Sequence, residues 1–377
     1  MARVSLKNIS KTYRAEKRGE VMVINDASFD IADGQFAVLV GPPGCGKSAI
    51  LRMIAGLEEV SKGEIYIGDK RMNDVAPKDR EIALVFQDYA LYPHMTVGDN
   101  LGFGLKLRKF SGTESKRRVS DAASVLGIDS LLNQKPRALD SSQRQRIALG
   151  RAIVRQPKVF LLDDPLSNLE STVRSGMRNE LMKLHQRLQA TMIYATQDPT
   201  EAMMMADRVV VMKGGSVQQT DTPLAVYEQP ANLFVAGYFG SAPMNLVAGR
   251  LKQDGDKLRF DESGGGTISI VFPANERPGA HDFSNRDIIL GIRPEDLRVA
   301  NLSRKEARAA GNSFPAIVDL VEPIGAETHI WLNTGAHTLI CRSRDRFDRS
   351  ETGRRFQFEV NLATAHLFDP ETTKRLF

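Results

Sequence analysis

The sequence predicts an α/β chain built around a phosphate-loop nucleotide-binding domain with a helical insertion. Residues 35–57, QFAVLVGPPGCGKSAILRMIAGL, join an apolar strand pattern to a glycine-rich turn and then to a helical pattern. Later apolar runs at 82–86, 159–162 and 191–196 are each followed by polar side chains, as in parallel strands that end at a binding edge. At 377 residues the chain exceeds what one hydrophobic core normally supports, so we expect two domains.

The glycine-rich turn is the first candidate site. It fits the pattern G-x-x-x-x-G-K-[ST], in which backbone N–H groups cradle phosphates, the lysine reaches the β- and γ-phosphates and the hydroxyl ligates Mg²⁺. An ordinary glycine turn is the alternative, but it does not explain both the preceding strand and the following helix. We therefore expect a nucleotide to bind at Gly41, Gly44, Cys45, Gly46, Lys47, Ser48 and Ala49.

Composition narrows the class of protein further. No apolar run approaches the roughly 18 residues of a membrane span, and the N-terminus lacks the apolar core of a signal peptide, so we expect a soluble, cytoplasmic protein. The two cysteines cannot form a disulfide framework, and the six histidines lack metal-ligand spacing. The only metal predicted is Mg²⁺ held with the nucleotide. A formal charge of +5 suits an anionic membrane surface or a plain solvated one.

The N-terminal residues are predicted to form two strands, 3–9 and 21–33, separated by a charged turn from Arg14 to Glu20. Tyr13 precedes this turn and has two interpretations, because an aromatic ring can stack on a nucleotide base or simply pack at a partly buried position. The phosphate loop downstream favours base stacking.

Polar residues at strand ends are the second set of candidates. Gln87 follows the run 82–86 and is a candidate for contact with Mg²⁺ or water. Asp163 and Asp164 follow the run 159–162, a pattern in which the first carboxylate supports Mg²⁺ and the next acid polarises water. Gln197 follows the strand 191–196.

The helical insertion is predicted at about 96–152. Apolar spacing is helical from Thr96 to about Lys135, and a further helix is expected within 139–152, opened by residues that cap helices well. These capping residues are Asp140, Ser141 and Ser142, with Gln143 next to them.

These motifs together resemble the ATP-binding subunits of ATP-binding-cassette importers, in the branch that serves sugars and sugar phosphates. The resemblance is carried by KTY at 11–13, the phosphate loop, VFQDYALYPHMTV at 85–97 and DPLSNL at 164–169. Past residue 235, MN at 244–245, ILGIRPED at 289–296, VEPIGAET at 321–328 and HLFDP at 366–370 resemble an all-β oligonucleotide/oligosaccharide-binding-type regulatory barrel. The resemblance implies domains at 1–235 and 236–377.

The resemblance also implies cofactors and partners. ATP and Mg²⁺ would bind between two subunits, a homodimer or a heterodimer, with the phosphate loop of one facing residues 139–143 of the other. Tyr13 would stack on the adenine. Integral membrane permease subunits would grip the segment from Gln87 to Met95 at the cytoplasmic face of the inner membrane, and an external solute-binding protein would act indirectly. Nucleic acid is not expected, because no basic strip with interleaved aromatics is present.

Several residues depart from the family pattern. The usual Leu-Ser-Gly-Gly-Gln signature is LDSSQ at 139–143, which puts the Asp140 carboxylate near the partner's γ-phosphate, at a cost on the order of a few kcal/mol. Asp is also an excellent helix cap, so the fold need not suffer. Asp164 replaces a glutamate one methylene longer, a loss on the order of a hundredfold in turnover. Gln197 replaces a histidine and cannot carry positive charge.

Smaller departures occur at Pro43, which lacks a backbone donor, at Ala49, which replaces a hydroxyl, and at Glu170, which replaces an aspartate.

Two functions remain open: a transport ATPase with weak hydrolysis, and a non-hydrolysing ATP-binding regulatory or structural subunit. A kinase or nucleic-acid-associated ATPase is disfavoured by the permease-docking-like segment and the barrel. The connection from Pro230 to Pro243 is expected to contain turns and little regular structure. The solute is not readable from the sequence.

Overall fold

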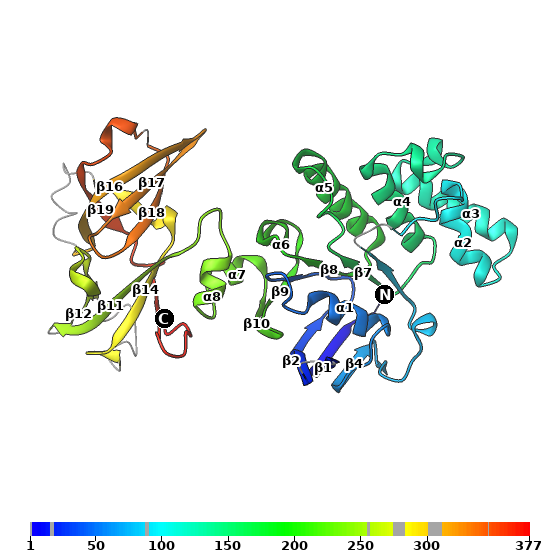
Figure 1. The fold of residues 1–377 in the computed structure, drawn as a ribbon, viewed down its shortest axis with the longest axis horizontal. Coiled ribbons are helices and arrows are strands. Elements are labelled where there is room, and N and C mark those ends of the chain that lie inside the picture. The colour runs from blue at the N-terminus through cyan, green and yellow to red at the C-terminus, as the bar shows by residue number, and fades with distance from the viewer. Residues whose placement is uncertain are drawn as a thin grey trace. The chain divides into compact units, whose positions relative to one another are not determined.

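The computed structural model describes residues 2–15, 19–86, 90–254, 257–273, 283–300, 311–345 and 347–377. The chain divides into two compact units, Met1–Leu224 and Ala225–Phe377. The first is an α/β unit and the second consists mainly of β-strands (Figure 1). Among the described residues, the helices are all too short or too polar to cross a membrane.

The first unit is organised by a six-stranded sheet of order β10-β9-β3-β8-β7-β6, parallel except for β10. Its strands are β3 (Phe36–Val40), β6 (Ile82–Val85), β7 (Val159–Asp163), β8 (Thr191–Thr196), β9 (Arg208–Lys213) and β10 (Ser216–Asp221). The register pairs Val40 with Thr196 and Asp163 with Ala195. The carboxyl ends of β3, β7 and β8 therefore meet at one edge, where the phosphate loop begins, and the predicted α/β fold class is confirmed.

A second sheet in this unit is antiparallel, in the order β2-β1-β4-β5, with bounds β1 (Val4–Ala15), β2 (Gly19–Ile31), β4 (Lys62–Ile67) and β5 (Lys70–Arg71). The predicted turn from Arg14 to Glu20 is wrong in its extent, because Arg14 pairs with Glu20 across the hairpin. The charged side chains are tolerated there since they are exposed and need not leave water.

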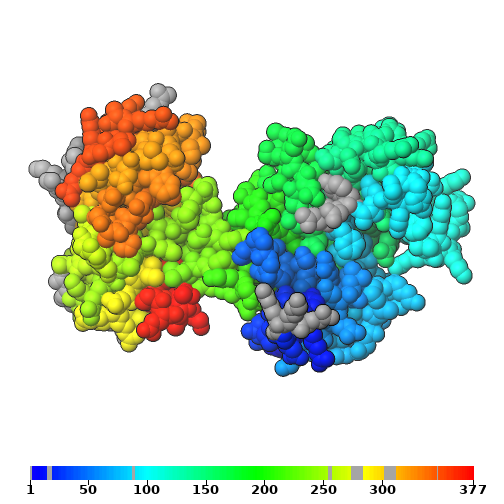
Figure 2. Space-filling view, in the orientation of Figure 1, coloured from blue at the N-terminus to red at the C-terminus, as the bar shows by residue number. Residues whose placement is uncertain are grey.

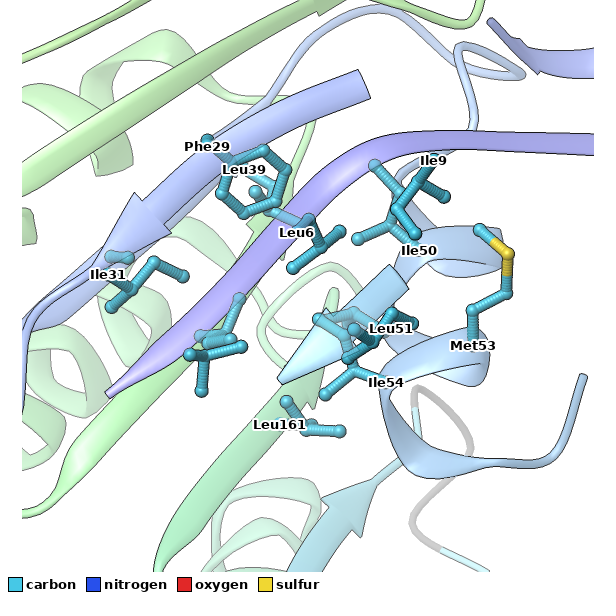
Figure 3. Close-up of a cluster of buried hydrophobic side chains, with 14 of the residues drawn as sticks. Leu6, Ile9, Phe29, Ile31, Leu39, Ile50, Leu51, Met53, Ile54 and Leu161 are labelled. Atoms are coloured by element: carbon cyan, nitrogen blue, oxygen red, sulfur yellow. The ribbon is translucent and has the colours of Figure 1, made fainter. Parts of the chain in front are cut away.

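Helix α1 (Lys47–Ala55) anchors the phosphate loop through its apolar residues. They pack into one buried cluster with strands of both sheets. Figure 3 shows part of this cluster, with labelled side chains Leu6, Ile9, Phe29, Ile31, Leu39, Ile50, Leu51, Met53, Ile54 and Leu161. Burial of this many apolar side chains fixes the helix, at about 1.5–3 kcal/mol for each fully buried one.

The helical insertion contains α2 (Val97–Leu107), α3 (Gly112–Leu126) and α4 (Ser141–Ile153). Thr96 and Ser111 cap α2 and α3 by accepting hydrogen bonds from the Asp99 and Glu114 backbone N–H groups. In Figure 2 the cyan to green residues of this insertion form one continuous mass within the first unit. The helices α5 (Ser171–Leu188) and α6 (Pro199–Met205) follow β7 and β8.

The second unit contains two antiparallel five-stranded sheets, of orders β13-β12-β11-β14-β20 and β15-β19-β16-β17-β18. Their bounds are β11 (Asn245–Asp254), β12 (Lys257–Glu262), β13 (Ser269–Pro273), β14 (Asp287–Ile292), β15 (Leu297–Val299), β16 (Ser313–Ile324), β17 (Glu327–Asn333), β18 (Thr338–Ser343), β19 (Arg355–Val360) and β20 (His366–Phe368). One hydrophobic cluster draws side chains from both sheets, so the sheets enclose a common core, as in a barrel. The predicted all-β second domain is confirmed.

Two short helices, α7 (Pro223–Glu228) and α8 (Leu233–Tyr238), precede these sheets. The expectation of little regular structure from Pro230 to Pro243 is therefore wrong. Val235 and Ala236 of α8 are buried, and Arg293 tethers the connection from within the second unit. Its guanidinium, 3% exposed, donates to the carbonyls of Tyr227, Ala236 and Phe239 at 2.6, 3.1 and 2.8 Å and lies 3.9 Å from the Tyr227 ring centroid.

Candidate nucleotide site

The phosphate loop takes a shape that only glycine permits at several positions. Gly44 and Gly46 have φ angles of 76° and 100°, in the left-handed region that other residues rarely enter. A Cβ on Gly46 would lie 2.2 Å from the Ile24 Cδ1 atom, and one on Gly41 would lie 2.2 Å from the Met212 carbonyl oxygen. The loop is thus held tightly between β3 and the start of α1.

The Lys47 side chain lies against this loop. Its ammonium donates to the carbonyl oxygens of Gly41 and Pro42 at 2.7 and 3.1 Å, and the buried Cys45 sulfur lies 3.6 Å from Nζ. Ala49 is buried in the hydrophobic cluster around α1, so its methyl group packs where a hydroxyl would need a partner. The cation is held at the loop, beside the N-terminus of a helix, where anions bind.

Ser48 and Asp163 are brought together, although 115 positions separate them in sequence. The Ser48 hydroxyl donates to the Asp163 Oδ1 atom at 2.8 Å. A hydroxyl and a carboxylate at this distance suit Mg²⁺, which takes oxygen ligands and usually binds through one or two carboxylates together with substrate phosphates. Gln87, the third predicted contact, lies among residues 87–89, which are outside the described part of the chain.

Asp164 follows directly, in an unusual backbone conformation with φ 45°. Its N–H donates to the Ala195 carbonyl at 2.9 Å, and its own carbonyl accepts from the Ser167 hydroxyl at 2.8 Å. Burial and the nearby Glu201 carboxylate together raise the pKa of its carboxyl to about 6, against the opposing charge of Lys47. A base with a pKa this close to neutral is well matched to accept a proton near pH 7.

Gln197 is exposed at the end of β8, in the segment that joins this strand to α6. Thr196 pairs with Val40 at the same sheet edge, next to the start of the phosphate loop. The structure therefore brings Lys47, Ser48, Asp163 and Asp164 together and places Gln197 at the edge that they share.

Sequence reasoning did not identify Glu201 and Arg174, which support this edge. Glu201 is buried, 2% exposed, and accepts hydrogen bonds from Tyr194 and Thr196. Arg174 donates to the carbonyls of Ser167 and Leu169 at 3.2 and 3.1 Å. An acid in a short helix and an arginine in a long one follow no motif, so only the fold shows what they contact.

The altered signature lies at the N-terminus of α4. Asp140 is its cap: Oδ1 accepts from the Gln143 N–H at 2.8 Å, and the Gln143 side chain accepts from the Asp140 N–H at 3.1 Å. This reciprocal pair is a capping box. Ser141 begins the helix, and the Ser142 hydroxyl lies 3.4 Å from the Met177 sulfur of α5. The Asp140 carboxylate thus already occupies a position where a helix N-terminus would otherwise favour a bound anion.

Tyr13 lies on β1, 37% exposed. Its hydroxyl donates to the Glu58 carboxylate, and the Lys11 ammonium lies 4.9 Å from its ring centroid. Partial burial and the bond to Glu58 raise the pKa of its phenol to about 12. These contacts leave part of the ring surface accessible for stacking.

The same unit contains a groove, which we call the β6–α2–α4 groove, with a volume of about 490 Å³. Tyr92 lies within it, 4.7 Å from the Phe103 ring and 4.9 Å from the Arg151 guanidinium. Leu107, 69% exposed, adds apolar surface. The other residues that line it are Lys78, Ala83, Leu84, Val85, Phe86, Ala90, Asn100, Leu101, Gly104, Arg108, Ala148, Ala152 and Arg155.

Comparison with family models finds three matches. Residues 24–167 match the ABC transporter family, 240–297 match the MalK OB fold domain and 290–368 match the TOBE domain. The first match covers the phosphate loop and both predicted Mg²⁺ contacts of the described residues, Ser48 and Asp163. The other two cover most of the second unit, in agreement with its barrel-like sheets.

Curated relatives align along the whole chain. The chain is 46% identical over 378 residues to the oligosaccharides import ATP-binding protein MsmX of Bacillus subtilis, with 100% of both chains covered. It is 46% identical over 384 residues to the trehalose/maltose import ATP-binding protein MalK of Thermococcus litoralis, again with 100% of both covered.

A solved ATP-binding cassette, a dimer in a post-hydrolysis state bound to ADP and Pi, has a TM-score of 0.53 and 29% identity to this chain. The alignment covers 58% of this chain and 98% of that one. Because relatives at 46% identity are covered over their full length and the site has the geometry described above, the chain belongs to the ATP-binding proteins of ABC transporters, in the group that contains MsmX and MalK.

Proposed function

We propose that this chain is the ATP-binding subunit that energises a membrane importer for a carbohydrate or a sugar phosphate. The observation that carries the proposal is the 2.8 Å contact between Ser48 and Asp163, which joins the two phosphate-site motifs at one sheet edge. Its full-length similarity to sugar import proteins specifies the kind of transporter. In this proposal the first unit, predicted as 1–235, forms the ATP-binding cassette with the insertion at about 96–152, and the second unit, predicted as 236–377, forms the regulatory barrel.

ATP binding follows from the geometry of the loop. The N–H groups of the loop and the Lys47 ammonium bind the β- and γ-phosphates, and Tyr13 stacks on the adenine. Ser48, Asp163 and Gln87 hold Mg²⁺, which neutralises charge that develops on the phosphate oxygens.

Hydrolysis is weak in this proposal. The attacking water needs an aligned acceptor, and the γ-phosphate needs positive or donating groups around it. Asp164 has a suitable pKa, raised to about 6, but its side chain is one methylene shorter than glutamate. Gln197 donates without charge, and Asp140 brings a carboxylate to the face that the partner's phosphate would approach.

The partners follow from the family and from the groove. Two subunits, identical or not, close on two ATP molecules, and the signature of each meets the phosphate loop of the other. The β6–α2–α4 groove receives integral membrane permease subunits, because its apolar and aromatic surface suits a docked helix. The chain then lies at the cytoplasmic face of the inner membrane, and an external solute-binding protein acts through the permease.

A second candidate function is a non-hydrolysing ATP-binding regulatory or structural subunit of such a complex. The capping box favours it, because the Asp140 carboxylate is held in place by the Gln143 N–H at 2.8 Å and cannot easily turn away from an approaching phosphate. Binding through Lys47 and Ser48 would persist in this case while turnover is lost.

Steady-state phosphate release from the purified chain with Mg-ATP separates the two functions. We expect slow release, well below the median enzyme rate of about ten per second. Release at about that rate would contradict weak hydrolysis, and bound ATP without any release would select the second candidate.

Co-purification with integral membrane proteins tests the role in transport. Leu107→Glu places a charge on exposed apolar surface of the groove and should abolish co-purification while ATP binding is retained. Leu57→Glu is the matched control, since Leu57 is 52% exposed and lies outside the groove residues. Equal losses in both variants, or in neither, would contradict docking at this groove.

A further inference from the structure

Glu201 is a buried acid that is hydrogen-bonded to β8 at the sheet edge where the phosphate loop begins. It belongs to α6, and its Oε2 atom accepts from the Tyr194 and Thr196 hydroxyl groups, each at 2.7 Å. Both hydroxyl residues belong to β8, the strand that ends beside the phosphate loop. A buried carboxylate is costly unless it is hydrogen-bonded, so this pair of donors fixes where Glu201 can lie.

The Thr196 hydroxyl connects Glu201 to the segment beyond β8. It donates to Glu201 and accepts from the Asp198 N–H at 3.1 Å. The Asp198 side chain in turn accepts from the Thr200 N–H at 2.8 Å, which caps α6. Gln197 therefore lies between two residues whose positions are fixed, one by the buried carboxylate and the other by the helix cap.

The Tyr194 hydroxyl is the second donor to Glu201, and it is not part of the hydrogen bonds that run from Glu201 through Thr196 to Asp198. Burial raises the pKa of the Tyr194 phenol well above its usual value, and the Glu201 carboxylate raises it further. The phenol consequently stays protonated and donates its hydrogen to Glu201. The two hydroxyl groups bind the same carboxylate oxygen at the same distance, but only that of Thr196 also contacts the backbone beyond residue 197.

We propose that Glu201 is a positioning residue of the nucleotide site: through the Thr196 hydroxyl it holds residue 197 in place at the sheet edge, where that side chain meets the terminal phosphate. The inference rests on the proposed function, because it requires ATP at the phosphate loop. It adds a residue from α6 that acts on residue 197 through its hydrogen bond with the Thr196 hydroxyl.

Calorimetric affinities for a non-hydrolysable ATP analogue and for ADP test this role in the full chain. The ratio of the two affinities reports the contacts to the terminal phosphate, and a general loss of structure would lower both. Thr196→Val removes the hydroxyl but keeps the shape, and it should lower the ratio about fivefold to tenfold, the upper part of the range for one ordinary hydrogen bond. Affinity for ADP should stay within about twofold.

Three further variants make the test specific. Thr196→Ser keeps the hydroxyl and should restore the ratio, and Tyr194→Phe, which removes the other bond to Glu201, should change it less than Thr196→Val does. In a Gln197→Ala background Thr196→Val should have no further effect, because the side chain that it positions is gone. If Glu201→Ala melts near the wild-type temperature, it should reproduce the effect of Thr196→Val.

The outcomes separate this inference from the proposed function. A wild type that binds neither nucleotide would overturn both. Nucleotide binding with a full Thr196→Val effect in the Gln197→Ala background, or with equal losses for both ligands, would overturn the positioning role alone.

Discussion

One part of the site, the holding side, would bind the nucleotide, and another part, the turnover side, would hydrolyse it. The charged side chains of the two sides differ in the contacts that they make. On the holding side, Lys47 donates to loop carbonyls and Ser48 contacts Asp163 at 2.8 Å. On the turnover side, Asp140 is committed to its own helix, and Asp164 lies in a left-handed backbone conformation with a raised pKa.

Under the proposed function, this difference assigns binding and hydrolysis to separate parts of one fold. Binding needs a cradle and a cation, which one loop between β3 and α1 supplies. In the same proposal, hydrolysis requires side chains that follow β7 and β8 and side chains from the start of α4 in correct alignment. A change at any of them would then reduce hydrolysis without altering the cradle. The four predictions below test this separation.

Repair of the turnover side should give the largest effect. Asp164→Glu, Gln197→His and the triple change Asp140→Ser, Ser141→Gly and Ser142→Gly should each recover little. All five together should raise phosphate release on the order of a hundredfold, because residues that act as a unit are not additive. Single-turnover phosphate release measures it.

Thermal melting is the control for this repair, and similar transition temperatures in all variants would exclude a folding defect. A single repair that gains as much as the full combination would contradict the view that these residues act as a unit.

Removal of the Lys47 ammonium should weaken ATP binding at the holding side. Lys47→Ala should weaken ATP binding by roughly 1.5–3 kcal/mol, the range of hydrogen bonds to charged groups, which corresponds to about tenfold to a hundredfold in Kd. Calorimetry measures the change. Lys106→Ala, at an exposed ion pair with Asp99, is the matched control. Equal ATP affinity in wild type and Lys47→Ala would contradict the role of Lys47 in phosphate binding.

Asp164→Asn should stabilise the nucleotide-free and metal-free protein. The usual pKa of 3.8 rises to about 6 in the fold, so the folded state disfavours the charged carboxylate. The wild type therefore loses stability as pH rises from about 4 to 6, and the neutral amide avoids this loss. Because the side chain is partly exposed, we expect a gain of about 1–2 kcal/mol at pH 7.5.

Urea unfolding at pH 7.5 and pH 4 measures this difference. The difference should shrink at the lower pH, where the folded wild-type carboxyl is protonated and the unfolded one, with a pKa of 3.8, is partly protonated as well. A gain that is independent of pH would show that charge is not its cause.

The smallest effect concerns the cap of α4. Asp140→Ala removes the capping box and should cost about 1 kcal/mol of unfolding free energy. Asp140→Ser keeps a capping oxygen and should change stability by only a few tenths of a kcal/mol. Equal stability of both variants, measured by urea unfolding, would show that the box contributes little and that the aspartate has another role.

Much of this site could be predicted from the sequence because its motifs are local. The loop from Gly41 to Ser48 and the pair Asp163 and Asp164 follow apolar strand runs, and strand order in a parallel sheet places such ends together. The capping role of Asp140 was also predictable, since a capping box needs only residues three positions apart.

The remaining features depend on contacts that no short pattern contains. The two strands of the N-terminal hairpin extend into the predicted turn, where Arg14 pairs with Glu20, because strand pairing overrides the charged composition. Helix α8 forms where Gly237 predicts a turn, since its apolar residues have a core to pack against. Glu201 and Thr196 meet only because α6 folds back on β8.

The Arg293 tether has a consequence for how this chain can be divided. A guanidinium shared among the carbonyls of Tyr227, Ala236 and Phe239 makes the connecting helices part of the cooperative folding unit of the β-sheets. The backbone amides of α8 should then exchange with deuterium at rates close to those of β14. An excised second unit should begin before Tyr227, because a start at the first β-strand would leave the arginine buried without its acceptors.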